Sequence, residues 1–323
     1  MGTFCVIGAT SWGLTLAWLL EARGHTVRVV TRTSGEAARL GHDRSLARTP
    51  GFRMPDTVEF STGPAIPPCD GIVVAAPAQS VRPTITALGE TTAPVLSAAK
   101  GIEFGTRLRI SQVLTERWPT APVAALSGPN LSAEILAGQP AAAVVACPRV
   151  EIAGLWQDAL SGQSFRCYRS GDLVGVELAG ALKNVIAIAA GVAWGLGLGA
   201  NTVSALMTRG LAEVTRLGVA SGASPETFRG LAGIGDLAAT CFSPLSRNRR
   251  FGELLAQGRS ADDARLAIGE AVEGIATAHA ALGLAAAAAV ELPICSAVAD
   301  ILEGRTTVAA AIVTLMGREP RAE

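Results

Sequence analysis

The chain has 323 residues, 49% of them hydrophobic and 4% aromatic, with 27 basic and 27 acidic residues. This length suits two domains, and so apolar a composition excludes a disordered chain. A formal net charge of zero excludes a global field that would draw the protein to nucleic acid or to a membrane surface, although a local cationic site is compatible with it.

Strand and helix patterns alternate through the first half of the chain. Two helices are expected, over Ser11–Arg23 and Glu36–Arg48, between short apolar runs that predict strands. These runs are TFCVI (3–7), HTVRVVT (25–31), DGIVVAAP (70–77), APVLSAAKG (93–101) and PVAALSGP (122–129). Their nearly continuous apolar character is typical of strands buried on both faces. Repeated strand–helix units predict an α/β domain with a parallel, doubly wound sheet.

The pattern changes near residue 172, where the strand signals stop. From Leu173 to Gly317 the sequence predicts helices separated by glycine-bearing turns. We therefore expect two domains, residues 1–172 with the sheet and residues 173–323 built from helices alone.

The most apolar segment is Leu178–Gly199, which reaches the length of a membrane span. Lys183 and Asn184 interrupt it, so we expect a buried helix and no membrane association. The GLGLG at its end follows a helix rather than a strand, which predicts a helix-terminating turn and not a second nucleotide loop.

The stretch GATSWG joins the first predicted strand to the first predicted helix. Gly8 and Gly13 have the spacing of the first and third glycines of the G-x-G-x-x-G fingerprint, whereas Thr10 stands at its middle position. In that context the backbone N–H groups around Ser11 and Trp12 would meet the phosphates of a dinucleotide at the helix N-terminus. The alternative is a tight strand–helix turn that binds no ligand.

The second predicted strand ends in Thr31, Arg32 and Thr33, where dinucleotide folds selective for NAD carry an acid for the ribose hydroxyls. A cation beside small hydroxyls suits a 2′-phosphate better than a bare diol, so the sequence favours NADP(H) over NAD(H). Arg32 taken alone is equally compatible with a solvated surface residue.

Two lysines stand out as candidates for the reacting end. Ligands of α/β sheets gather outside the carboxyl ends of the strands, and Lys100 is expected there, unless it only extends along the surface to water. Lys183 interrupts an apolar helix, where an unpaired ammonium is costly and burial disfavours the charged form of an amine. Such a lysine suits proton transfer near neutral pH, and the alternative is a helix-end lysine that reaches water.

The stretch GLAGIGDLAATCFSPLSRNRRFG holds the next candidates. Asp236 lies in a glycine-bearing turn, and Thr240 follows four residues later. Arg247, Asn248 and two further arginines then crowd together, and guanidinium groups with an amide are suited to grip a phosphate. A solvated basic face is the alternative. Nucleic acid is not expected, because the cluster is small and lacks interleaved aromatic residues.

Other chemistries find no support in the sequence. The three histidines lack the spacing of metal ligands, and no cysteine has an obvious base near it, so we expect no metal. Six scattered cysteines without a CxxC pair suit a reduced cytoplasm. The absence of a basic segment before the first strand predicts no signal peptide, and we expect a cytoplasmic protein.

Together these stretches resemble the bacterial NAD(P)-dependent glycerol-3-phosphate dehydrogenases. The likeness extends over nearly the whole chain and is densest in SGPNLSAEI, in GALKNVIAIAAG with the GLGLGANT and LMTRGLAE that follow, and in GLAGIGDL with CFSPLSRNRRFG. The resemblance implies a Rossmann-type domain, a helical domain and a homodimer. It also implies reversible reduction of dihydroxyacetone phosphate by NAD(P)H to sn-glycerol 3-phosphate, which feeds phospholipid synthesis.

The same resemblance implies roles for individual residues. By position, Lys183 corresponds to the acid/base lysine that protonates the ketone oxygen, and Lys100 to a second lysine that touches substrate and cofactor. Asp236 and Thr240 would orient the reacting end of the substrate. The other implied positions are a substrate loop and phosphate grip at Gly128, Asn130, Ser132, Ser246, Arg247 and Asn248, and cofactor contacts at Gly8, Thr10, Ser11, Trp12, Gly13, Arg32, Lys100, Arg247 and Glu273.

Thr10 departs from the family pattern, which keeps the middle glycine. A Cβ there crowds the pyrophosphate unless the turn shifts, although a threonine hydroxyl is able to donate to a phosphate oxygen. We therefore expect weakened but retained cofactor binding, and tighter binding in Thr10→Gly. Two other functions stay open: a dehydrogenase of another small 2-hydroxy or 2-keto acid, with Arg247 on a carboxylate, and a non-catalytic dinucleotide sensor.

Overall fold

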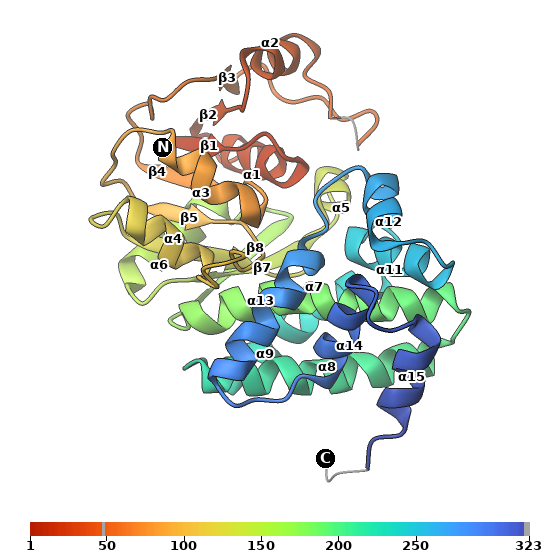
Figure 1. Ribbon diagram of the computed structural model, residues 1–323. Helices are drawn as coiled ribbons and strands as arrows, with labels where there is room; N and C mark the ends of the chain where they lie inside the picture. Colours follow the sequence, from red (N-terminus) through yellow and green to blue (C-terminus); the bar gives the residue numbers. More distant parts are fainter. Residues whose placement is uncertain (47–48, 320–323) are drawn as a thin grey trace. The chain divides into compact units, whose positions relative to one another are not determined.

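A computed structural model describes residues 1–46 and 49–319, which form two compact units (Figure 1). The first unit comprises Met1–Lys100 and Leu108–Glu177. The second comprises Gly101–Arg107 and the described residues from Leu178 onward. The short segment after Lys100 thus packs with the helical part of the chain, which no feature of the sequence had suggested. The domain boundary expected at residue 172 stays a prediction.

The first unit is built on a mostly parallel sheet with the strand order β3-β2-β1-β4-β5-β6-β7-β8. Its strands are β1 (Thr3–Ile7), β2 (Thr26–Val30), β3 (Glu59–Ser61), β4 (Gly71–Val74), β5 (Val95–Ser97), β6 (Val123–Ser127), β7 (Ala141–Ala146) and β8 (Phe165–Ser170). The prediction of a parallel sheet is confirmed except at one pair, because β6 and β7 run antiparallel. Between them lies only α5 (Ser132–Leu136), and five helical residues span about 7.5 Å, too little to return along β6.

Both faces of this sheet are buried. Successive residues of β1 point to opposite faces, so Phe4 and Val6 join one apolar cluster and Cys5 and Ile7 join another. Helices α1 (Ser11–Glu21) and α6 (Val150–Leu160) cover the first face, and α3 (Ala78–Thr86) and α4 (Ile110–Arg117) cover the second. The continuous apolar strands of the sequence therefore indicated the layers correctly.

Helix α2 (Ser34–Asp43) is shorter than the helix predicted over 36–48. It begins two residues earlier, because Thr33 caps it, and Arg44 ends it in a left-handed conformation with φ 56°. Residues 47 and 48 of that prediction lie outside the described residues.

From α7 (Leu173–Gly195) onward the second unit is helical in its described part, as predicted, whereas its segment Gly101–Arg107 contains turns and no helix. Its elements after α7, which begins in the first unit, are α8 (Ala200–Ala220), α9 (Pro225–Arg229), η1 (Leu231–Gly235), α10 (Asp236–Phe242), α11 (Arg247–Ala256), α12 (Ala261–Ile268), α13 (Glu273–Ala287), α14 (Pro293–Leu302) and α15 (Val308–Met316). The GLGLG turn separates α7 from α8.

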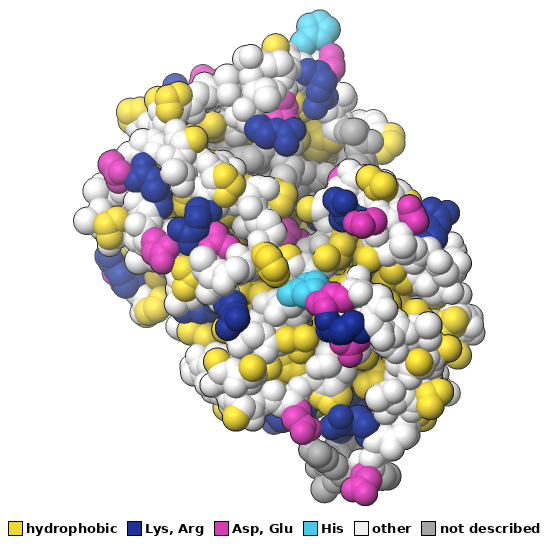
Figure 2. Space-filling view, in the orientation of Figure 1, with side chains coloured by type: hydrophobic (Ala, Val, Ile, Leu, Met, Phe, Trp, Pro, Cys, Tyr) yellow, Lys and Arg dark blue, Asp and Glu magenta, His cyan; other side chains and the backbone are white. Residues whose placement is uncertain are grey.

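Helix α7 (green in Figure 1) is long and apolar enough to cross a membrane, but 78% of its most apolar window is buried inside the protein. Its apolar character therefore agrees with the core helix predicted from the sequence. On the face shown in Figure 2, basic and acidic side chains are interspersed, in keeping with a formal net charge of zero.

Candidate active site

The turn between β1 and α1 packs closely against the chain that leaves β4. Gly8 has φ 104°, and a Cβ added to it would lie 3.2 Å from the carbonyl oxygen of Ala75. A Cβ on Gly13 would lie 2.1 Å from the carbonyl oxygen of Gly8. Both glycines are therefore required by this turn, as the first and third glycines of a dinucleotide fingerprint are.

Thr10 is the N-cap of α1. Its Oγ1 accepts a hydrogen bond from Gly13 N at 3.0 Å and donates to the Ala75 carbonyl oxygen at 2.8 Å. The hydroxyl proton that the sequence assigned as a possible donor to phosphate is thus already committed within the protein. Ser11 and Trp12 begin α1, and the indole Nε1 of Trp12 is buried without a hydrogen-bond partner among the described residues.

The chain after β2 shows how Arg32 is presented. Thr31 donates its hydroxyl proton to the carbonyl oxygens of Thr33 and Ser61, and Thr33 caps α2 by accepting from Glu36 N at 3.2 Å. The side chain of Arg32 is exposed, and it makes no ion pair among the described residues. Its guanidinium is therefore available to an anion at the carboxyl end of β2.

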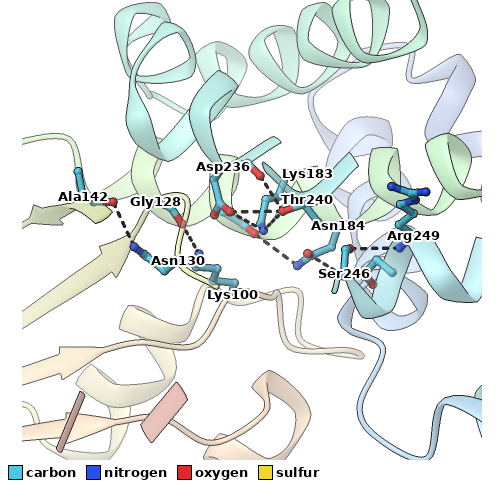
Figure 3. Close-up of polar contacts among 12 residues, drawn as sticks. Lys100, Gly128, Asn130, Ala142, Lys183, Asn184, Asp236, Thr240, Ser246 and Arg249 are labelled. Carbon is cyan, nitrogen blue, oxygen red and sulfur yellow. Dashed lines mark hydrogen bonds and ion pairs between the residues drawn. The ribbon is translucent and has the colours of Figure 1, made fainter. Parts of the chain in front are cut away.

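Lys100 lies in the loop after β5, where the sequence placed it. Its Nζ donates to the carbonyl oxygen of Gly128 at 2.7 Å, in the loop after β6 (Figure 3). Asn130 donates from Nδ2 to the Ala142 carbonyl oxygen at 3.1 Å, while its Oδ1 is buried and has no partner in the part of the chain that the structure describes. Ser132 begins α5. Lys100, Gly128 and Asn130 are thus gathered at one edge of the first unit's sheet.

Lys183 is buried in α7 with two oxygen partners from α10. Its Nζ donates to Asp236 Oδ1 at 2.6 Å and also to Thr240 Oγ1 (Figure 3). Thr240 in turn donates to the Asp236 backbone carbonyl at 2.6 Å. The exposed fractions of Lys183, Asp236 and Thr240 are only 7%, 2% and 6%. The ammonium has a third N–H, which is suited to an oxygen of a substrate.

A π-helical turn, η1, positions Asp236 at the start of α10. It ends at Gly235, directly before Asp236, and π turns are rare and frequently found at functional sites. The turn depends on Gly233, because a Cβ there would lie 2.1 Å from the carbonyl oxygen of Phe228. Sequence reasoning identified Asp236 and a glycine-bearing turn but not this π geometry.

Two glycines bring α11 against α7. A Cβ on Gly191 would lie 1.9 Å from the Arg249 carbonyl oxygen, and one on Gly252 would lie 2.1 Å from the Ile188 carbonyl oxygen. The two helix backbones therefore touch at this crossing. The side chains that start α11 are held beside the polar part of α7.

Asn248 is tied into this crossing. It donates from Nδ2 to Asn184 Oδ1 at 2.9 Å and accepts from Gly274 N at 3.0 Å, at the start of α13. One Nδ2 hydrogen is left for a ligand. Asn184 was noted in the sequence only as an interruption of an apolar helix, and its polarity at a buried position was the signal for this role.

The neighbours of Asn248 are bound in different ways. Arg247 pairs with Glu270 at 3.1 Å, a partner that the sequence did not reveal. Ser246 caps α11, accepting from Arg249 N at 3.2 Å. Arg249 forms an ion pair with Glu253 at 2.8 Å within α11, so its role is to stabilise the helix.

The predicted residues thus fall into two groups, each assembled within one unit. The first unit brings together the dinucleotide turn, Lys100, Gly128 and Asn130. The second brings together Lys183, Asp236 and Thr240, and separately Ser246, Arg247 and Asn248, with Glu273 as the first residue of α13. In residues 1–46 and 49–319, no three histidine, cysteine, aspartate or glutamate side chains are grouped so as to hold a metal ion.

The residues of the first unit fit a dinucleotide. The glycine turn leaves the N–H groups of Ser11 and Trp12 at a helix N-terminus. The buried polar atoms that have no partner within residues 1–46 and 49–319 include Trp12 Nε1, Ser97 Oγ and Asn130 Oδ1. Each of these three residues lies at or just beyond the carboxyl end of a strand of this sheet, where ligands of such sheets bind.

Comparison with known proteins gives a consistent result over the whole chain. Residues 3–153 match the family model described as the N-terminus of NAD-dependent glycerol-3-phosphate dehydrogenase, and residues 172–313 match the C-terminus model. A glycerol-3-phosphate dehydrogenase [NAD(P)+] of Corynebacterium glutamicum is 45% identical over 334 residues, covering 100% of both chains. One of Chlorobium limicola is 42% identical, covering 98% of each.

The solved structures agree with this. A glycerol-3-phosphate dehydrogenase from Coxiella burnetii superposes with a TM-score of 0.92 at 33% identity, covering 98% of this chain and 99% of that one. A D-mandelate dehydrogenase shares only the fold, at 12% identity and a TM-score of 0.62. The chain therefore belongs to the NAD-dependent glycerol-3-phosphate dehydrogenase family.

Proposed function

We propose that the protein catalyses the reversible, NAD(P)H-dependent reduction of dihydroxyacetone phosphate to sn-glycerol 3-phosphate, for glycerophospholipid synthesis. The observation that carries this proposal is the buried ammonium of Lys183, held by Asp236 and Thr240 with a third N–H directed to neither. A ketone that becomes an alkoxide needs a positioned proton and nearby positive charge, and this ammonium supplies both.

Each residue has one task in this proposal. When bound, the nicotinamide supplies the hydride to the carbonyl carbon. Lys183 Nζ gives a proton to the carbonyl oxygen during reduction and takes it back from the hydroxyl during oxidation. Asp236 and Thr240 hold the ammonium in place, and Lys100 contributes a second positive charge at the carbonyl end.

The phosphate of the substrate is assigned to the start of α11. Ser246, Arg247 and Asn248 present a hydroxyl, a guanidinium and an amide hydrogen there. Such binding, remote from the reacting carbon, positions the substrate for proton and hydride transfer. Gly128, Asn130 and Ser132 are assigned to the loop over substrate and cofactor, and Glu273 to a cofactor contact.

The experiment that tests this function follows absorbance at 340 nm with dihydroxyacetone phosphate, using NADPH and NADH in parallel. Oxidation that requires the phosphorylated ketone supports the proposal. Turnover of a 2-keto acid that inorganic phosphate does not inhibit would reassign the substrate, and tight NADPH binding without any turnover would make the protein a sensor.

For the cofactor we propose NADP(H) in preference to NAD(H). The support is the exposed guanidinium of Arg32 at the carboxyl end of β2, beside Thr31, which donates its hydroxyl proton to the Thr33 carbonyl oxygen, and Thr33, whose hydroxyl accepts from Glu36 N. We expect Arg32→Asp to lower kcat/KM for NADPH about tenfold or more while leaving that for NADH within about twofold, since only the 2′-phosphate is lost as a partner. An equal loss for both cofactors would contradict this assignment.

We also propose that the enzyme is a cytoplasmic homodimer. Zero net charge and the burial of α7 support a protein that is free of membranes. Light scattering after size exclusion, on protein from the supernatant of a detergent-free extract, tests both points. A single mass near 33 kDa would exclude the dimer, because the chain mass is 32.9 kDa.

A further inference from the structure

Thr10 stands where the dinucleotide fingerprint has its middle glycine, yet its side chain is used in a way that glycine cannot copy. One hydroxyl joins two parts of the first unit. It accepts from Gly13 N inside the first turn of α1 and donates to the carbonyl oxygen of Ala75, just past β4. The backbone at Thr10, with φ −68° and ψ 163°, is extended, so the residue is unstrained.

This link spans an important position in the sheet. The strand order reverses between β1 and β4, and a dinucleotide binds in the crevice at such a switch point. Gly8 and Gly13 both approach Ala75 closely, with added Cβ atoms only 3.2 Å from its carbonyl oxygen and 3.1 Å from its Cβ. The Thr10 hydroxyl therefore closes a contact that the two glycines make possible.

The bonds also leave the phosphate-binding groups available. Gly13 N is satisfied by Thr10, while the N–H groups of Ser11 and Trp12 are the first two of α1 and precede any intrahelical bond. The side chain of Thr10 reaches Ala75, which is buried at 4% exposure, and so extends toward the protein. The hydroxyl of Thr10 is therefore directed at Ala75 and not at the N–H groups of Ser11 and Trp12.

We propose that Thr10 is a positioning residue whose hydroxyl locks the β1–α1 turn onto the end of β4, so that the turn is held in its binding conformation before a dinucleotide arrives. The inference rests on the proposed binding of NADP(H). It reverses the effect of Thr10→Gly expected from the sequence: loss of the lock and the greater freedom of glycine weaken binding.

Three substitutions distinguish a positioning role of the Thr10 hydroxyl from steric crowding of the pyrophosphate by the Thr10 side chain. Thr10→Ser keeps the hydroxyl, Thr10→Val keeps the bulk without it, and Thr10→Gly removes both. The dissociation constant of NADP⁺ is measured by calorimetry without substrate, and amide hydrogen exchange of Gly13 and its neighbours in the cofactor-free protein is measured by mass spectrometry. Thr307→Val removes an equivalent N-cap from α15 and serves as the control, with thermal unfolding to verify folding of every variant.

If the hydroxyl positions the turn, the dissociation constant of the serine variant for NADP⁺ matches that of the wild type within about twofold. The valine variant binds about fivefold more weakly, the ratio that corresponds to one lost N-cap. The glycine variant also binds more weakly than the wild type, because it loses the bond to Ala75 and gains backbone freedom. Both variants exchange faster at the first turn of α1. The control changes neither quantity.

Tighter binding by the glycine variant would restore the crowding explanation and overturn the lock. So would a valine variant that matches the wild type, or faster exchange without loss of affinity. If the wild type binds no NADP⁺, the dinucleotide assignment itself fails and the positioning role fails with it. Equal binding by all four proteins refutes the lock alone.

Discussion

At the residue scale, the pair formed by Lys183 and Asp236 links stability to activity. Both charges are buried, and each offsets part of the hydration that the other loses. We expect Asp236→Asn to destabilise the protein by about 3–5 kcal/mol, because an uncompensated ammonium is left inside. The combined variant Lys183→Met with Asp236→Leu recovers most of that loss. Urea unfolding of the three proteins measures the differences.

The order of activities differs from the order of stabilities once the single variant Lys183→Met is added to this set. Lys183→Met removes the proton donor and is expected to lower kcat by about 10²–10⁴-fold, while the dissociation constant of NADP⁺ stays within about twofold. The combined variant stays as inactive as Lys183→Met although it is more stable than Asp236→Asn. Restored turnover in the combined variant would remove Lys183 from the chemistry.

The sequence predicted these residues individually but not their pairing. Lys183 was conspicuous as a charge within an apolar helix, and Asp236 as an acid in a glycine-bearing turn. That they meet depends on the π turn η1, which is set by packing of Gly233 against Phe228 and has no periodicity of its own. Glu270, the partner of Arg247, lies 23 residues away in an unremarkable segment, so pattern reasoning had no means to find it.

At the scale of elements, the crossing of α7 and α11 controls the substrate phosphate site. We expect Gly252→Ala to destabilise the protein by about 1–3 kcal/mol, because its Cβ would lie 2.1 Å from the Ile188 carbonyl oxygen and must push α11 away. The KM for dihydroxyacetone phosphate rises more than kcat falls, since the displaced residues are Arg247 and Asn248. Steady-state kinetics and thermal unfolding measure both effects.

A matched alanine substitution separates the crossing from a general effect on helices. Gly41 lies within α2, where an added Cβ would meet no atom within 4 Å. We expect Gly41→Ala to stabilise the protein by about 0.5–1 kcal/mol, since alanine is favoured over glycine inside a helix. Equal behaviour of the two variants would show that the backbone contact between α7 and α11 has no special importance.

The N-terminus of α14 has an unusual cap. Leu292 offers no side-chain acceptor there, and Glu213 of α8 instead accepts from Ile294 N at 2.8 Å. Burial raises the pKa of Glu213 to about 7, and the backbone N–H groups of Ile294 and Cys295 only partly oppose this. The unfolded chain releases this proton near the ordinary value of 4.5, so the folded state holds more protons between these two values.

Stability conferred by Glu213 therefore falls as the pH rises from about 4.5 to about 7, and is level above that. We expect the free energy of unfolding of Glu213→Gln, relative to wild type, to increase by about 3 kcal/mol across this range, because the amide carries no charge at either end. Urea titrations at several pH values test it. Glu226→Gln, at an exposed position in α9, is expected to show no comparable increase.

At the scale of the whole molecule, the reactivity of the cysteine thiols measures how well the interior is shielded from solvent. Five of the six are buried, and Cys69 is partly exposed. Burial raises the pKa of Cys5, Cys167 and Cys241 to about 12, so these thiols are protonated and unreactive in the folded state. At pH 8 we expect an aromatic disulfide reagent to label at most one thiol rapidly in native protein, and all six in urea. Two or more rapid thiols would contradict this packing.

The layers of the fold were accessible from the sequence because buried strands and helices have distinct apolar patterns. The antiparallel pairing of β6 with β7 was not, since the pattern of a strand carries no direction. The segment Gly101–Arg107 was also missed. It joins the helical unit through contacts such as the ring of Phe104 on His279, which no local property of a seven-residue stretch reveals.

The π turn before Asp236 makes the site sensitive to a deletion of a single residue. Each residue of an α-helix turns the chain by about 100°, and each residue of the wider π turn by somewhat less, so loss of one residue from η1 would rotate α10 by a large angle. Asp236 and Thr240 would then turn away from Lys183 together, although every side chain of the site was still encoded. A substitution in η1 at a position other than Gly233 keeps the number of residues in the turn, whereas a change of length there separates both Asp236 and Thr240 from Lys183 at once.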